Sequence, residues 1–321
     1  MIQRYDFAPL DGITKVVFRQ VYHRLFGGAD RYFLPFFSPT DQHILTKRDR
    51  RELDPAANAG LRVVPQVMTR RAPDFLWAAE LLEDMGYTEV NLNLGCPSGT
   101  VTAKGKGSGF LAKPEELERF FDEVFASVKL PVSVKTRLGV KEPEEFERLL
   151  EIYNRYPIAC LTIHPRVQKQ FYKGTVYRDW FAWAAERSRN PLCYNGDLVT
   201  VEDCGAFAAD FPAVDAVMIG RGAVADPALF RKLRGGTPAT RREIQTFTRT
   251  LYQSYQEFYG QVGPAAQRMK EVWFFLIHLF EGGERHHKRM RRLRTPAEYE
   301  AVEAAIFQEL PLRDHAEGAF G

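Results

Sequence analysis

The sequence has few cysteines, and their spacing argues against two common kinds of site. Its 321 residues include four cysteines, Cys96, Cys160, Cys193 and Cys204, with no CxxC pair and no histidine at metal-ligand spacing. A disulfide framework and a structural zinc site both need such regular spacing. We therefore expect four free thiols, no bound metal and a reducing compartment.

Long apolar runs and a large net charge are also missing. No stretch approaches the roughly 18 consecutive apolar residues of a membrane span, and residues 1–10 contain Arg4 and Asp6 instead of a signal-peptide core. We expect a cytoplasmic protein that does not bind a membrane. The formal net charge is only +3, from 44 basic and 41 acidic residues, so affinity for nucleic acid must come from local basic clusters.

Eight short apolar segments alternate with helix-like segments through the first 235 residues. These segments are Tyr5 to Leu10, Tyr32 to Phe37, Val63 to Met68, Glu89 to Leu94, Val132 to Arg137, Cys160 to Arg166, Leu192 to Asp197 and Ala216 to Arg221. Eight strand-helix units predict an α/β fold of the (β/α)8 barrel type. An open doubly wound sheet is the alternative, but its GxGxxG is absent from the first strand-to-helix turn.

After Gly235-Gly236 the pattern changes to longer helical runs, such as Arg241 to Tyr259 and Gln267 to Phe280. We therefore expect a catalytic barrel over residues 1–235 and a small all-α domain over residues 236–321. The run from Arg285 to Arg294 has six Arg or Lys residues and no acid. Such a run is often only a solvated helix face, and its alternative role is to contact phosphates.

The alternation of side chains along the predicted strands places polar groups inside the barrel. Asn91 and Asn93 alternate with aliphatic residues that suit the helix layer, and Gln66 opposes Val67 in the same way. The same parity applies to a second set, Ser133, Lys135, Arg137, Thr162, His164 and Arg166. Because most barrels fill their lumen with aliphatic side chains, this lining predicts a ligand site at the carboxyl ends of the strands.

Two kinds of loop at those strand ends carry recognisable chemistry. Cys96 follows the fourth strand and opens a glycine-rich loop, where a largely protonated thiol can serve as a general acid or a nucleophile. The segments Asn195-Gly196-Asp197 and Gly220-Arg221-Gly222 follow the last two strands, where barrels commonly bind phosphate. Alone, each loop could be an ordinary turn and Cys96 a buried structural residue.

Taken together, these motifs resemble the tRNA-dihydrouridine synthase family. The resemblance rests on Ala8-Pro9-Leu10-Asp11-Gly12-Ile13-Thr14, Asn93-Leu94-Gly95-Cys96-Pro97, Lys135, Thr162-Ile163-His164-Pro165-Arg166, Asn195-Gly196-Asp197 and Gly220-Arg221-Gly222, in this order. It implies a bound FMN, NADPH or NADH as reductant, and tRNA or another structured RNA as substrate. Reduced flavin would give hydride to carbon 6 of a uracil, and Cys96 would protonate carbon 5.

The resemblance also implies roles for the other residues. Cofactor contacts are expected from Pro9, Leu10, Gln66, Lys135, His164, Asn195, Gly196, Asp197, Gly220 and Arg221. Contacts to the substrate or to RNA are expected from Asn93, Lys104, Arg166, Arg285, Lys288, Arg289, Arg291 and Arg292.

Three other functions are compatible with parts of the pattern. One is an FMN-dependent ene-reductase or dihydropyrimidine-type dehydrogenase acting on a small molecule, which leaves the basic run without a role. In an aldolase-like barrel Lys135 would form a Schiff base, which leaves Cys96 and the glycine loops unexplained. The third, a non-catalytic RNA-binding module, gives Cys96, Lys135 and His164 no purpose.

Overall fold

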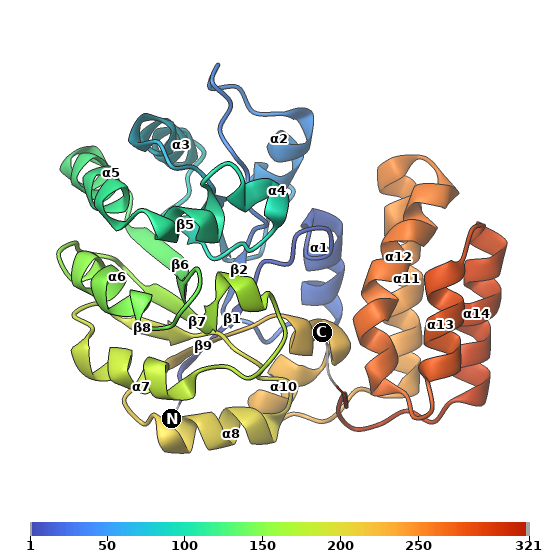
Figure 1. Cartoon of the computed structure of the whole chain (residues 1–321). Coiled ribbons are helices and arrows are strands. Elements are labelled where there is room, and N and C mark those ends of the chain that lie inside the picture. Colours follow the sequence, from blue (N-terminus) through green and yellow to red (C-terminus); the bar gives the residue numbers. More distant parts are fainter. Residues whose placement is uncertain (1, 319–321) are drawn as a thin grey trace.

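The computed structural model describes residues 2–318 and contains a closed parallel barrel (Figure 1). Its strands are β1 (Arg4–Phe7), β2 (Arg31–Phe33), β3 (Val63–Val64), β4 (Gln66–Val67), β5 (Val90–Leu94), β6 (Val132–Gly139), β7 (Leu161–Val167), β8 (Leu192–Tyr194) and β9 (Ala216–Ile219). β3 pairs with β2 and β4 pairs with β5, and Pro65 alone separates these two segments. Because proline has no N–H to donate, it divides one strand into the two segments β3 and β4. Counted as one strand, they give the barrel eight strands.

Helices connect the strands and cover the outside of the barrel (Figure 1). They are α1 (Val16–Leu25), α2 (Lys47–Leu53), α3 (Ala72–Asp84), α5 (Pro114–Ser127), α6 (Glu145–Tyr153), α7 (Arg178–Arg187) and α8 (Val201–Asp210). In α5, Pro114 occupies the first turn and Leu117, Phe121 and Val124 are buried on one face, as their spacing predicts. The short helix α4 (Gly99–Thr102) and the 3-10 helix η1 (Gly107–Ala112) lie in the loop after β5.

The predicted fold class is confirmed, since each of the eight predicted apolar segments overlaps a strand of the barrel. Several strands end before the predicted segment does, among them β2 at Phe33 and β8 at Tyr194. The following residues leave the sheet, and Asp197 has a φ of 45°, in the left-handed region that a β-strand does not use. This departure carries Asn195 to Asp197 over the top of the barrel.

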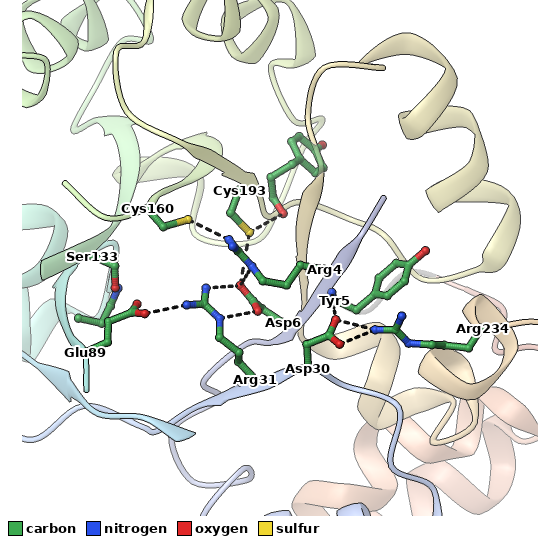
Figure 2. Close-up of polar contacts among 12 residues, drawn as sticks. Arg4, Tyr5, Asp6, Asp30, Arg31, Glu89, Ser133, Cys160, Cys193 and Arg234 are labelled. Carbon is green, nitrogen blue, oxygen red and sulfur yellow. Dashed lines mark hydrogen bonds and ion pairs between the residues drawn. The ribbon is translucent and has the colours of Figure 1, made fainter. Parts of the chain in front are cut away.

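The amino-terminal end of the barrel is closed by a buried ionic network (Figure 2). Arg31 donates to Asp6 at 2.9 and 2.7 Å and to Glu89 at 2.8 Å. Arg4 donates to the sulfur of Cys160 at 3.1 Å. The network pairs the charged groups at this end, so the opposite end of the barrel is the one left available for a ligand.

The chain after the barrel is helical, with α9 (Arg221–Ala225), α10 (Leu229–Leu233), α11 (Arg241–Tyr259), α12 (Val262–Leu276), the 3-10 helix η3 (Ile277–Leu279), α13 (Glu284–Arg292) and α14 (Pro296–Glu309). Phe247 of α11 packs edge-on against Phe18 and Tyr22 of α1, with ring centroids 5.9 and 6.4 Å apart. Residues 319–321 of the predicted helical domain lie outside the described residues. Among the helices described, none is long and apolar enough to cross a bilayer.

Candidate active site

A cavity of about 510 Å³ opens at the carboxyl ends of the strands. Its lining includes Ala8, Pro9, Leu10, Asp11, Gln66, Asn93, Cys96, Lys135, Arg137, His164, Tyr172, Asn195, Gly196, Asp197, Gly220, Arg221, Phe274 and Phe275. The size falls within the usual range for small-molecule and cofactor sites. All ten residues expected to contact a cofactor, together with Cys96 and Asn93, lie on this one cavity.

Cys96 is held by hydrogen bonds on both sides of its peptide unit. Its N–H donates to Oδ1 of Asn93 at 3.0 Å, and its carbonyl accepts from the N–H and hydroxyl of Ser108 at 3.1 and 2.9 Å. Gly107 has a φ of 56°, and a Cβ there would lie 2.8 Å from the Cys96 carbonyl oxygen. The loop therefore needs glycine to close on the cysteine.

Burial raises the pKa of the Cys96 thiol, and the charge of Asp11 raises it further against the opposing effects of Arg137 and Lys135. A raised pKa keeps the sulfur protonated at neutral pH. Cys96 is therefore suited to donate a proton rather than to attack as a thiolate. The other three cysteines are buried, and all four are free thiols.

Lys135 and His164 lie on neighbouring strands and both face the cavity. Burial, reinforced by Arg137, lowers the pKa of Lys135 to about 7. Burial also lowers the pKa of His164 well below its usual value, together with the charges of Arg137 and Lys135. Arg166 lies 3.2 Å from His164 Nε2, and since an arginine can only donate, Nε2 accepts and Nδ1 carries the proton.

Arg166 is not among the residues that line the cavity, and its expected contact with substrate or RNA stays a prediction. Its side chain is buried and donates to Asp197 at 3.0 and 2.5 Å and to the carbonyl oxygen of Gly174 at 2.6 Å. Arg221 also donates to Asp197, at 2.7 Å. In this structure Arg166 therefore holds Asp197 and the loop after β7 in place.

Several cavity residues were missing from the set predicted from sequence. The guanidinium carbons of Arg137 and Arg221 lie 5.3 and 5.0 Å from the centre of the Tyr172 ring, so both arginines make cation–π contacts with it. Phe274 and Phe275 reach the same cavity from α12. Strand parity had placed Arg137 in the lumen, but no sequence signal connects α12 with the barrel mouth.

Apart from the buried Arg166, the predicted RNA-contacting residues outside the cavity are exposed. Lys104 lies in the loop after α4, and α13 exposes Arg285, Lys288, Arg289, Arg291 and Arg292. Its buried side chains are His286 and Met290. His287, on one flank of the buried pair, packs edge-on against the cavity residue Phe274 with ring centroids 5.2 Å apart.

Helix geometry divides the basic residues of α13 between two flanks. Arg291 lies one turn after His287 and on the same flank, whereas Arg285 and Arg289 lie on the opposite flank. One flank of this helix therefore continues toward the cavity and the other does not. Within residues 2–318 no group of three or more His, Cys, Asp or Glu side chains is placed to hold a metal ion.

Comparison with known proteins agrees with this geometry. The model of the dihydrouridine synthase family matches residues 6–310. A protein of Synechocystis sp. named "Probable tRNA-dihydrouridine synthase 1" is 31% identical over 278 residues, covering 83% of this chain and 76% of its own length. The "tRNA-dihydrouridine(16) synthase" of Ralstonia nicotianae is 31% identical over 241 residues, covering 73% of both chains.

Among solved structures, morphinone reductase has a similar fold, with a TM-score of 0.50 and 16% identity over 73% of this chain and 86% of its own. At that identity the likeness concerns the barrel fold only. The family match spans both the barrel and the helical region, and it includes the segments that build the cavity. The chain therefore belongs to the dihydrouridine synthase family.

Proposed function

We propose that this protein reduces the C5=C6 bond of a uridine in tRNA to 5,6-dihydrouridine, with bound FMN as cofactor and NADPH or NADH as reductant. The observation that carries the proposal is the meeting of a protonated thiol, Cys96, and a cation, Lys135, on one cavity in a member of this family. The names of the Synechocystis and Ralstonia relatives support tRNA as the substrate.

The donor groups of the cavity fit a flavin ring. Burial lowers the pKa of Lys135, Arg137 lowers it further and two thiols oppose this, with no carboxylate among these influences. Gln66 and Asn93 add amide groups, and His164 adds an N–H at Nδ1. Such a set suits a ring edge made of carbonyl and imine acceptors that gains negative charge on reduction. Gly196, Gly220 and Arg221 would lie along its phosphate and ribityl chain, with Pro9 and Leu10 on the facing wall.

When bound, the flavin would supply a hydride to carbon 6 of the uracil. Addition there leaves enolate character on carbons 4 and 5, and the thiol of Cys96 then protonates carbon 5. The new C–H bond forms as the S–H bond breaks, and the thiolate recovers its proton from solvent. Arg137 and Tyr172 would bound the space for the uracil, because they line the cavity near Cys96 and are fixed against each other.

The lowered pKa of Lys135 would also suit a Schiff-base lysine. The family match argues against that chemistry, and so does the thiol on the same cavity, which an aldolase reaction does not use. In our proposal the lysine acquires its full charge when an electron-rich ring binds beside it.

The helical region would position the RNA. We propose that residues 1–235 form the catalytic domain and residues 236–321 an RNA-binding domain, with the exposed arginines of α13 contacting phosphates. Arg291, on the flank that leads to Phe274, would lie nearest the extruded nucleotide. A uracil must leave its stack to enter a cavity of this kind.

The test is to reconstitute the purified protein with FMN, add NADPH and unmodified tRNA, and analyse the nucleosides by mass spectrometry. Uridine that gains two hydrogen atoms supports the proposal, with Cys96→Ala as the inactive control. A flavin-loaded protein that leaves tRNA unchanged but reduces a small enone would refute the RNA assignment. Failure to bind FMN would refute the cofactor assignment.

A further inference from the structure

A continuous row of side-chain hydrogen bonds crosses three strands beneath the cavity. Gln66 of β4, Asn91 of β5 and Ser133 of β6 are direct neighbours in the strand register. Nε2 of Gln66 donates to Asn91 Oδ1 at 2.8 Å, and Nδ2 of Asn91 donates to Ser133 Oγ at 2.9 Å. All three side chains are buried. The row adjoins Asn93, whose Nδ2 donates to Oε1 of Gln66 at 2.6 Å.

The direction of this row is fixed at one end by the backbone. Oδ1 of Asn93 accepts from the N–H groups of Gly95 and Cys96, both at 3.0 Å, and only an oxygen can do so. The amide nitrogen of Asn93 must therefore point toward Gln66, whose Oε1 accepts the hydrogen bond. The same logic passes to Asn91, whose nitrogen then faces the hydroxyl of Ser133.

The consequence for a ligand is a defined pattern of donors. Gln66 and Asn93 both line the cavity, whereas Asn91 and Ser133 do not. Each cavity amide uses one N–H within the row, which leaves its second N–H available to a ligand in the cavity. Both lone pairs of Asn93 Oδ1 are already used. With Lys135 beside them, these N–H groups favour a ligand that presents acceptor atoms to them.

We infer that Asn91 and Ser133 are positioning residues: they hold the Gln66 amide so that it presents an N–H to the ligand, and they support the Asn93 anchor of Cys96. This inference rests on the proposed function for the identity of the ligand, FMN. Loss of the Ser133 hydroxyl leaves the buried Asn91 N–H without an acceptor, so the row loosens from the far end toward Gln66.

The test compares Ser133→Ala with Thr162→Val and Ser133→Thr. Thr162 is also buried and polar, on β7, and its hydroxyl has no hydrogen-bond partner among the described residues. We expect Ser133→Ala to weaken FMN binding about fivefold, the equivalent of one hydrogen bond, and to shift the flavin absorption bands and midpoint potential. Thr162→Val should stay within about twofold of wild type, and Ser133→Thr, which keeps the acceptor, should recover the wild-type values.

A second measurement does not depend on FMN. In the flavin-free protein, the side-chain amide protons of Gln66 and Asn91 should exchange slowly by NMR in wild type and Thr162→Val, and faster in Ser133→Ala. Equal exchange rates of these amide protons in all three proteins would overturn the inference. If Ser133→Ala does not fold, rapid exchange in the wild-type protein would overturn it instead. A wild-type protein with slow exchange but no FMN binding or tRNA reduction would support the row and refute only the proposed function.

Discussion

Replacement of Lys135 by methionine should stabilise the flavin-free protein. The pKa of Lys135 is lowered to about 7 by burial and Arg137, whereas the unfolded chain has the ordinary value of 10.5. At about 1.4 kcal/mol for each tenfold change in proton affinity, this difference corresponds to an upper bound of about 5 kcal/mol. Methionine keeps a similar length without the charge, so we expect a gain of a few kcal/mol at pH 7.

The sign of the effect sets its pH dependence. Below pH 7 the lysine is protonated in both the folded and the unfolded chain, and the full destabilisation is present. Between pH 7 and 10.5 only the unfolded chain binds the proton, so the destabilisation declines as the pH rises. Urea unfolding of both proteins at pH 6 to 9 checks this, with the exposed Lys129→Met as the control. An equal stability difference at every pH would refute the buried-lysine argument.

The affinity for FMN should also depend on the protonation of Lys135. If the bound ring restores the charge of Lys135, the complex holds a proton that the free protein loses above pH 7. The dissociation constant of FMN should then rise up to tenfold for each pH unit above 7, and it should be flat in Lys135→Met. Quenching of FMN fluorescence measures this directly. A wild-type affinity independent of pH would show that the lysine does not sense the ligand.

Three further predictions concern the thiol, the basic helix and a glycine loop. Cys96→Ala should keep FMN binding and flavin reduction by NADPH while lowering tRNA turnover at least a hundredfold, measured by nucleoside mass spectrometry, because only proton donation is lost. Arg291→Gln should raise the KM for tRNA about fivefold and reduce the salt dependence of tRNA binding by the equivalent of roughly one phosphate contact. Arg289→Gln, on the other flank, should change the KM less than half as much. Gly222→Ala should cost about 1–3 kcal/mol in urea unfolding and weaken FMN binding, since its Cβ would lie 2.6 Å from a neighbouring carbonyl oxygen; Gly205→Ala, with open space at its Cβ, should not.

The barrel could be predicted from the sequence because its strands obey simple geometry. Side chains alternate between the two faces of a strand, so the parity of Lys135 and His164 was enough to place both in the lumen. The eight apolar segments fixed the number of strands in the same way. Even Pro65, which interrupts one strand, left the predicted segment in the correct place.

The remaining cavity residues depend on contacts that no periodicity describes. Phe274 and Phe275 lie in the predicted helical run from Gln267 to Phe280, and only the docking of α12 on the barrel brings them to the cavity. Tyr172 lies in an irregular loop, next to Phe171 with its φ of 53°. Arg166 shares the parity of His164, but its partner Asp197 comes from another strand end, so the pair could not be inferred from either segment.

The two ends of the barrel treat the same kind of residue in opposite ways, and this contrast indicates where the ligand belongs. At the amino-terminal end, here called the floor, burial alone would lower the pKa of Arg31. The hydrogen bonds and charge of Asp6, together with the charge of Glu89, raise this pKa above its usual value. At the mouth, burial lowers the pKa of Arg137 to about 10 and that of Lys135 to about 7, because no carboxylate compensates for their burial. A protein that kept these cations only for stability would pair them, as it does at the floor. These cations at the mouth have no carboxylate partner among the described residues and destabilise the fold, and an electron-rich ligand can relieve this. Ligand binding and catalysis are therefore expected at this end of the barrel.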